Sequence, residues 1–231
     1  MQIIWKGQSC FQISLQPEKN SQVRIVIDPF DETLGLKLPS MEADILLITH
    51  HHRDHDNSKA IKGNPFLVDG PGEYEIKKIY IQGIFSFHDD SQGKQRGENT
   101  IYTIEAEDFK LCHLGDLGQK ELSASQIEKI GNVDILMIPI GGVYTIDSKG
   151  AQKIISQIEP KIIIPMHYQI PSFRRAKAKV EKKETSSTPK LDSLDKFLKV
   201  MGIKTAETLN KLLIKKKDLS EEGLKVVVLG P

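Results

Sequence analysis

Short apolar segments rich in Ile and Val recur along the chain and end at Gly, Pro, Asp or Asn. Segments of this length and composition are typical of β-strands. Several show no polar alternation, for example Asp44-Ile-Leu-Leu-Ile48 and Lys161-Ile-Ile-Ile164, which indicates strands buried on both faces. Strands are predicted over residues 2–5, 11–15, 23–27, 44–49, 66–68, 79–87, 99–105, 109–113, 133–139, 161–166 and 225–229.

Apolar residues at helical spacing are fewer and fall between some of these strands. Positions i, i+3, i+4 and i+7 are apolar from Ala151 to Ile158, and Pro160 ends that pattern. A second helix is predicted around residues 191–198, and a third follows a capping box formed by Ser123 and Gln126. Helices mixed with strands that are buried on both faces predict a layered α/β fold.

A weak internal repeat suggests how the layers are built. The segment 23–28 ends in Asp28 and precedes the apolar strand after Asp44, while the segment 109–116 ends in Asp116 and precedes the apolar strand after Asp134. Each half therefore consists of a strand, an acidic residue, an excursion and a buried strand. Two similar sheets packed face to face, with helices on their outer faces, would give this pattern. Chance similarity between Ile-rich strands is the alternative explanation.

The composition is that of an ordinary globular protein. Lys and Arg number 32 against 31 Asp and Glu, so the net charge of +1 gives no general attraction to nucleic acid or to an anionic membrane. We recognise no signal peptide or membrane span, and we expect Cys10 and Cys112 to be reduced and buried. We therefore expect a cytoplasmic protein with one domain over residues 1–231, and a homo-oligomer stays open.

One segment departs from this composition. Residues 172–190 are polar, basic and poor in apolar side chains. Such a segment is typical of a surface loop or a disordered insertion. Contact with a phosphate backbone is the alternative, which we consider the weaker one.

All seven histidines lie just past predicted strands. Residues 45–49 lead into His50-His-His-Arg-Asp-His55, and the strands that end near residues 87, 112 and 166 lead into His88, His113 and His167. Because the ends of neighbouring strands meet at one edge of a sheet, side chains distant in sequence can converge there.

The segment His50-x-His52-x-Asp54-His55 has the residue types of a metal site. In an extended or tightly turning loop, His50 and His52 project to the same side and can bind one cation, while Asp54 and His55 reach a second. Imidazole and carboxylate ligands suit borderline metals such as Zn²⁺ or Mn²⁺, and this mixture with open positions is typical of catalysis. A histidine-rich surface loop that binds metal adventitiously would not explain the other histidines at strand ends.

These motifs resemble those of the metallo-β-lactamase-fold hydrolases, and among them the ascorbate-phosphate-lactonase-like and uncharacterised small Zn-dependent hydrolases. The family signature is His-x-His-x-Asp-His after a strand. The resemblance covers nearly the whole chain except 172–190, and it implies an αββα four-layer sandwich of two packed mixed sheets flanked by helices. The supporting segments are Ile27-Asp-Pro29, residues 49–56, Phe87-His-Asp-Asp90, His113-Leu-Gly-Asp116, Pro139-Ile-Gly-Gly142, Pro165-Met-His-Tyr168 and Lys225-Val-Val-Val-Leu229.

The resemblance also implies a set of ligands for two divalent cations, with Zn²⁺ favoured over Mn²⁺. By this likeness, the first cation is held by His50, His52 and His88, the second by Asp54, His55 and His167, and Asp116 bridges both. Many relatives have Gly-His-Ser near the start, whereas this chain has Gly7-Gln8-Ser9, so a group at the mouth of the pocket differs.

Asp54 and His113 are the predicted catalytic residues. We expect Asp54 to orient the attacking hydroxide and to accept a proton. His113 is expected to face the substrate or to support a ligand, with a purely structural role as the alternative. Asp28 is expected to orient a ligand imidazole, or else to cap a turn before Pro29.

The sequence therefore predicts a metal-dependent hydrolase. Hydroxide activated by a dinuclear metal site would attack a small ester, lactone or phosphorylated substrate. The alternatives are a phosphodiesterase or nuclease of the same fold, and a non-catalytic metal-binding protein. The balanced charge and the lack of a separate nucleic-acid-binding domain argue against a nuclease. A complete set of seven ligands argues against the non-catalytic alternative.

Overall fold

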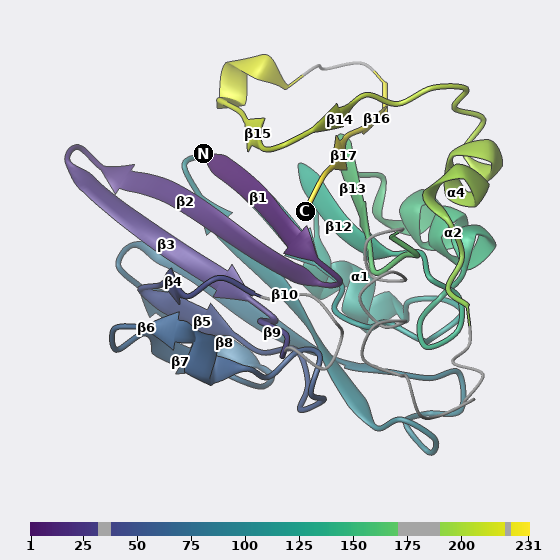
Figure 1. Ribbon diagram of the computed structural model, residues 1–231, viewed down its shortest axis with the longest axis horizontal. Helices are drawn as coiled ribbons and strands as arrows, with labels where there is room; N and C mark the ends of the chain where they lie inside the picture. The colour runs from purple at the N-terminus through teal and green to yellow at the C-terminus, as the bar shows by residue number, and fades with distance from the viewer. Residues whose placement is uncertain (32–37, 171–189, 220–222) are drawn as a thin grey trace, which may run out of the picture.

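Two mixed β-sheets packed face to face form most of this computed structural model, which describes residues 1–31, 38–170, 190–219 and 223–231 (Figure 1). The first sheet has the order β15-β1-β2-β3-β5-β7, with β15 (Leu212–Leu213), β1 (Gln2–Gly7), β2 (Cys10–Glu18), β3 (Ser21–Ile27), β5 (Ile45–Leu47) and β7 (Phe66–Val68). The second has the order β16-β13-β12-β11-β10-β9-β8, with β16 (Lys225–Val226), β13 (Ile162–Met166), β12 (Ile135–Pro139), β11 (Phe109–His113), β10 (Glu98–Ala106), β9 (Ile79–Phe87) and β8 (Gly72–Ile76).

The main core lies between the two sheets, because alternate side chains of each strand point inward. Ile25 and Ile27 of β3 join this core, while Val26 faces the other side of the same strand and belongs to a second, smaller core. Leu46 of β5 also lies in the smaller core, together with Phe30. The apolar strands without polar alternation are thus buried on both faces, as their sequences indicate.

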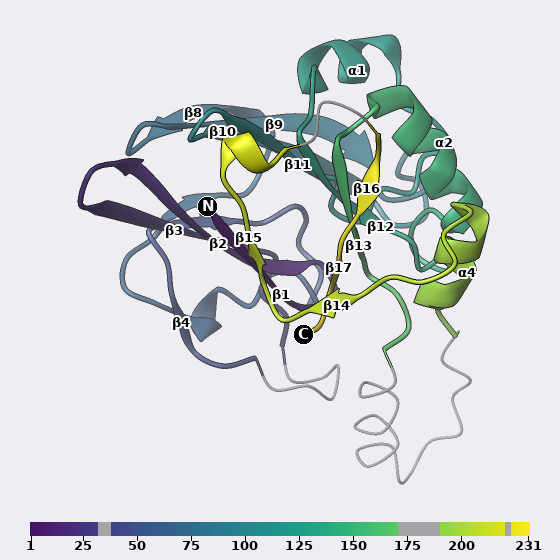
Figure 2. The ribbon, with the colours of Figure 1, turned by 90° about the horizontal axis from the view of Figure 1, so that it is seen from above.

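The two outer layers are built differently. Helices α1 (Ala124–Ile130), α2 (Ser148–Ile158) and α4 (Leu194–Val200) all lie on the side of the second sheet (Figure 2). On the outer side of the first sheet, within the part of the chain that the structure describes, loop residues and the short sheet β4 (Met41–Glu42)–β6 (Ile61–Lys62) form the smaller core in place of an α-helix. The predicted sandwich of two packed mixed sheets is confirmed, and within the described residues its α-helices lie on the side of the second sheet.

All three predicted helices are present. In α2 the periodic residues from Ala151 to Ile158 are buried, and the side chain of Asp147 accepts a hydrogen bond from the N–H of Gly150. The capping box of Ser123 and Gln126 precedes α1, as predicted. These caps satisfy backbone N–H groups that have no partner inside the helix, and they fix where each helix begins.

The strands differ from the prediction at the ends of the sheets. The predicted strand 225–229 divides into β16, which pairs with β13, and β17 (Val228–Leu229), which pairs with β14 (Thr208–Leu209). The sequence also did not predict the edge strands β8 and β15. The internal repeat corresponds to two parallel pairs, β3 with β5 in one sheet and β11 with β12 in the other.

Both cysteines are free and buried, as predicted. Burial raises the pKa of the Cys112 thiol to about 12, so the thiol is protonated at neutral pH. No helix among the described residues is long and apolar enough to cross a membrane. The predicted basic segment 172–190 lies outside the described residues, apart from Lys190.

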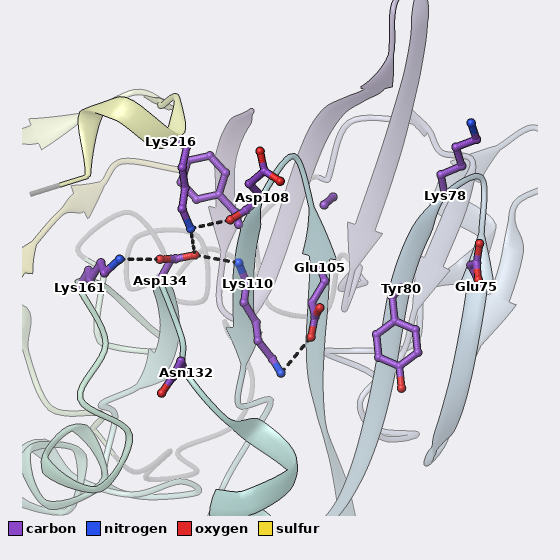
Figure 3. A pocket seen from close by; sticks show the side chains of 12 residues that line it. Glu75, Lys78, Tyr80, Glu105, Asp108, Lys110, Asn132, Asp134, Lys161 and Lys216 are labelled. Atoms are coloured by element: carbon purple, nitrogen blue, oxygen red, sulfur yellow. Dashed lines mark hydrogen bonds and ion pairs between the residues drawn. The ribbon is translucent and has the colours of Figure 1, made fainter. Parts of the chain in front are cut away.

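A charged network at the amino ends of the parallel strands connects a C-terminal segment to the second sheet (Figure 3). It lines a broad hollow of about 970 Å³. The buried carboxylate of Asp134 accepts hydrogen bonds from Lys216 at 2.8 Å and from the backbone N–H of Lys110 at 3.0 Å, and it lies 3.2 Å from the ammonium of Lys161. Burial alone would raise the pKa of Asp134, but these partners outweigh burial and lower it.

We expect Asp134→Asn to lower the free energy of unfolding at pH 7 by about 1–2 kcal/mol, since both lysines are partly exposed and their attraction is screened. A carboxylate whose pKa is lowered by folding stabilises the protein above about pH 4, and this contribution is lost as the pH falls through that range. Urea unfolding should therefore show a deficit for the variant that shrinks on acidification. Glu105→Gln, which removes an exposed pair with Lys110, is the matched control and should change stability by less than about 0.5 kcal/mol. An equal deficit at pH 7 and pH 3 would contradict this account.

Candidate metal centre

The predicted ligands lie in loops at the opposite edge of the sheets. The segment from His50 to His55 follows β5, His88 follows β9, Asp116 follows β11 and His167 follows β13. These loops come from both sheets, so the site lies where the two sheets meet. His55, His88, Asp116 and His167 are almost completely buried, whereas the side chain of Asp54 is 30% exposed.

The side-chain nitrogens and oxygens of these residues fall into three groups that can each hold a metal ion, because their ligand atoms lie within 4.8 Å of one another. The groups are His50, His52 and His88; Asp54, His55 and His167; and His50, His55 and Asp116. The first two groups contain the residues that the family resemblance assigns to the first and the second cation. All seven predicted ligands thus lie together, and their role as ligands stays a prediction.

Asp116 lies at the centre of this cluster. Its Oδ2 is 3.2 Å from Nε2 of His55, 3.3 Å from Nε2 of His167 and 3.4 Å from Nε2 of His88. One carboxylate oxygen therefore faces three imidazoles that come from three different loops. An oxygen in this position can bridge two cations held by those imidazoles.

Asp28 positions two of the histidines. Its Oδ2 accepts hydrogen bonds from Nδ1 of His55 at 2.9 Å and from the hydroxyl of Thr49 at 2.7 Å. The hydroxyl of Thr49 lies 3.0 Å from Nδ1 of His50. Nδ1 of each imidazole is thereby engaged, which leaves Nε2 of His55 and His50 available as the predicted ligand atoms. Of the two roles predicted for Asp28, orientation of an imidazole and capping of a turn before Pro29, these contacts favour the first.

Two further polar residues hold Asp116. The hydroxyl of Ser9 donates to its Oδ1 at 3.1 Å, and its backbone N–H donates to Oδ1 of Asn99 at 2.9 Å. Gly115 allows this approach, because a Cβ there would lie 2.3 Å from Oδ1 of Asn99 and its backbone has a φ of +56°. Sequence reasoning did not identify Ser9, Thr49 or Asn99 as parts of the site.

His113 is completely buried and lies behind the ligands. Its Nε2 donates to the backbone oxygen of Ser9 at 2.9 Å, and its Nδ1 accepts from the N–H of Gly115 at 3.1 Å. Both ring nitrogens are engaged in holding the segments that support Asp116. This geometry favours the predicted supporting role of His113 over contact with a substrate, while its predicted catalytic role stays untested.

Gln8 acts on the site through its backbone. Its carbonyl oxygen accepts hydrogen bonds from the indole N–H of Trp5 at 2.8 Å and from the N–H of His167 at 3.1 Å. Gln8 and His167 both adopt a positive φ, of 50° and 51°. The turn at Gln8 therefore fixes the segment that carries the predicted ligand His167, and this effect does not depend on the side chain at position 8.

Electrostatics hold His50, His88 and Asp116 in the protonation states that metal binding needs, whereas for His55 the charges of Asp116 and Asp28 outweigh burial and raise the pKa. Burial, together with His55 nearby, lowers the pKa of His50 to about 2, and burial also lowers the pKa of His88. Burial opposes the charge of Asp116, but the neighbouring His167 and His55 outweigh it and hold the pKa of this carboxyl well below its usual range. At neutral pH, His50 and His88 are neutral and Asp116 is ionised, as metal binding requires.

The donor set fits a metal ion on independent grounds. Nε2 of His50, His55 and His167 are buried and make no hydrogen bond of regular geometry within the described residues, although those of His55 and His167 lie 3.2 and 3.3 Å from Oδ2 of Asp116. Buried polar atoms without a partner are uncommon and destabilising, and several of them around one carboxylate indicate a missing partner. Two divalent cations, one at the group of His50 and one at the group of His55 and His167, would satisfy these nitrogens.

Comparison with known proteins agrees with this geometry. A family model described as the β-lactamase superfamily domain matches residues 2–167. A UPF0173 metal-dependent hydrolase of Thermoplasma volcanium is 32% identical over 73% of this chain and 83% of its own. A second, from Staphylothermus marinus, is 30% identical over 89% of this chain and 97% of its own.

A solved structure resembles this chain over almost its full length. It is a protein from Thermotoga maritima proposed to be a Zn-dependent hydrolase of the metallo-β-lactamase superfamily. The two chains are 32% identical with a TM-score of 0.73, and the match covers 99% of this chain and 98% of that one. The sequence relatives and the solved structure thus agree on the family of this chain.

Proposed function

This chain belongs to the β-lactamase superfamily domain family and to the UPF0173 metal-dependent hydrolases, and on that premise we propose that it uses two Zn²⁺ ions to hydrolyse a small ester, lactone or phosphorylated ester. One observation carries the proposal. The oxygen Oδ2 of Asp116 lies within 3.4 Å of Nε2 of three histidines, between two groups of three ligands each. Two divalent cations at these groups would share Asp116 and leave open positions for substrate.

Bound divalent cations supply a nucleophile at neutral pH, because they lower the pKa of water from 15.7 to about 7, and they polarise the oxygen that is attacked. The chain supplies the geometry. His50, His52 and His88 would hold one ion, and Asp54, His55 and His167 the other. Asp28, Thr49 and Ser9 keep the ligand atoms aimed at the ions, so little reorganisation is needed during the reaction.

Asp54 has a second role in this proposal. Burial opposes its ionisation, but the hydrogen bond and charge of His55 outweigh burial and lower its pKa, so its carboxylate is ionised at neutral pH. Unlike Asp116, it is partly exposed, so it can contact both an ion and the attacking water. We assign to Asp54 the orientation of that water and the acceptance of its proton.

Metal analysis combined with a substrate panel tests this function. Purified protein, dialysed against metal-free buffer and reloaded with Zn²⁺, should contain close to two equivalents per chain by mass spectrometry. The loaded protein should hydrolyse a lactone or a carboxylic ester, and chelation should abolish this hydrolysis. Hydrolysis of only a phosphodiester would identify the alternative predicted from the sequence. Fewer than one ion per chain and no hydrolysis of any substrate would refute the proposal.

A further inference from the structure

A groove of about 580 Å³ adjoins the metal centre. His88 belongs to both, since it is a member of a ligand group and also lines the groove. The remaining lining comes from the loop after β9, from residues 118–120, from the loop 142–147 and from the first turns of α2. When a scissile bond lies at the metal ions, the rest of a substrate can extend into this groove.

Most charges in the groove are already neutralised. Lys120 lies 2.9 Å from Asp90, and Lys153 lies 3.0 Å from Glu121. Asp147 caps α2 through the N–H of Gly150. The two paired lysines therefore have little charge left to offer to an anionic ligand.

Asp89 is also fully occupied, and its contacts shape the loop that follows His88. Its carboxylate accepts hydrogen bonds from the backbone N–H groups of Ser91, Gly93, Gln95 and Arg96 and from the hydroxyl of Ser91. The loop closes with a hydrogen bond from the N–H of His88 to the oxygen of Gly97. The backbone at Arg96 is therefore tied directly to the segment that carries a metal ligand.

Two cations in the groove have no acidic partner within the described part of the chain, Arg96 and Lys149. The guanidinium carbon of Arg96 lies 4.3 Å from the centre of the Tyr144 ring, a cation–π contact that joins the loop after β9 to the loop before α2. The contact orients the guanidinium while its N–H groups stay available, because the ring binds its face. A guanidinium with free N–H donors matches a carboxylate or phosphate through two parallel hydrogen bonds.

We propose that this groove is a substrate subsite in which Arg96 and Lys149 bind an anionic group, a carboxylate or a phosphate, that the substrate carries away from the bond being hydrolysed. The inference rests on the proposed hydrolase function and narrows its substrate class to anionic esters or lactones. Arg96 would orient the anionic group through two parallel hydrogen bonds, and Lys149 would supply a second positive charge. Tyr144 and Asp89 are positioning residues, because they act through Arg96.

Three esters test the subsite on the Zn²⁺-loaded protein: phenyl acetate, 4-carboxyphenyl acetate and 4-phosphonophenyl acetate. For each protein variant, kcat/KM for an anionic ester is divided by kcat/KM for phenyl acetate, which removes any general loss of activity. Arg96→Gln should lower this ratio about 10- to 100-fold, mainly through KM, as expected for a lost hydrogen bond to a charged group. Lys149→Gln should lower it less. Lys153→Gln is the matched control, since Lys153 lines the same groove but is paired with Glu121.

The outcomes separate the subsite from the hydrolase function. Hydrolysis of phenyl acetate with a ratio that Arg96→Gln leaves unchanged would overturn the subsite and leave the function standing. A decrease for the phosphonate ester alone would identify phosphate as the group bound, and a decrease for the carboxylate ester alone would identify carboxylate. If no ester is hydrolysed, the proposed function is in doubt. Calorimetric binding of phenylphosphonate still decides the subsite, because it should weaken in Arg96→Gln and not in Lys153→Gln.

Discussion

Asp116→Ala is expected to lower the Zn²⁺ content to less than one ion per chain after dialysis and to reduce hydrolysis roughly 1,000-fold or more. Among the described residues, Asp116 faces histidines of both ligand groups, with its Oδ2 3.2 Å from Nε2 of His55 and 3.4 Å from Nε2 of His88. Replacement of Asp116 by Ala removes the anion that the two predicted ligand groups share. A metal ion stabilises the transition state by several kcal/mol, and the loss of that stabilisation corresponds to a rate decrease of this size. Mass spectrometry of the dialysed protein and initial rates on the best ester of the panel measure both effects.

Two comparisons make this result specific. Asp116→Asn keeps the shape and the hydrogen bond to Ser9 but removes the charge, so it should also lose metal. Ser9→Ala removes only the bond to Oδ1 and should weaken Zn²⁺ binding about 10- to 100-fold while allowing full loading at high metal concentration. Circular dichroism should show a folded protein in each case. A folded Asp116→Ala that retains two ions and normal rates would contradict the central position given to this carboxylate.

Much of the fold could be predicted from the sequence because burial on two faces leaves a direct mark on composition. The strands Ile45–Leu47 and Ile162–Met166 are apolar at every position and buried at every position. The edge strand Gly72–Ile76 carries exposed Glu73 and Glu75 and pairs on one side only. Its strand conformation is set by the neighbouring β9, which is a tertiary effect that local patterns do not record.

Local patterns say less about the outer layer over the first sheet, for a related reason. The smaller core is completed by Phe30, Leu38, Met41 and Ile61, which come from loops and from two-residue strands. Their spacing follows neither the helical period nor the strand period. The sequence pattern therefore gives no local signal for the residues that cover this face of the sheet.

The site shows the same division between chemistry and support. Histidines and aspartates at strand ends could be recognised from the sequence as predicted metal ligands, because few other roles explain so many of these residues at one edge of a sheet. Ser9, Thr49 and Asn99 are small polar residues of a kind found throughout any chain, and only their contacts with Asp116 and Asp28 give them a function. Thr49 directly precedes the His-x-His motif, and that position is the one signal that could have identified it. For Gln8, the sequence directed attention to the side chain, whereas the structure gives the backbone carbonyl the contact with His167.

The second large effect is expected at Asp54, which we propose to be both a metal ligand and a proton acceptor. Asp54→Asn should reduce kcat about 100- to 10,000-fold, the usual range for loss of a general base, while the protein retains most of its metal. Retention is expected because His55 and His167 stay in place, and because Asp116 still links them to the other group. The amide keeps the size of the carboxylate but cannot accept the proton. Metal content together with kcat therefore separates Asp54 from Asp116, whose replacement removes both.

Asp56 provides the matched control in the same loop. Its carboxylate is partly exposed and lies 2.9 Å from Nδ1 of His51. Neither Asp56 nor His51 belongs to the three ligand groups. Asp56→Asn should change kcat less than about threefold, since it disrupts only an exposed pair. If Asp54→Asn lost metal and activity in parallel, Asp54 would be a ligand alone and the proton would need another acceptor. If it lost neither, the attacking water would be oriented without this carboxylate, and the assignment of the catalytic base would fail while the ligand cluster around Asp116 would still stand.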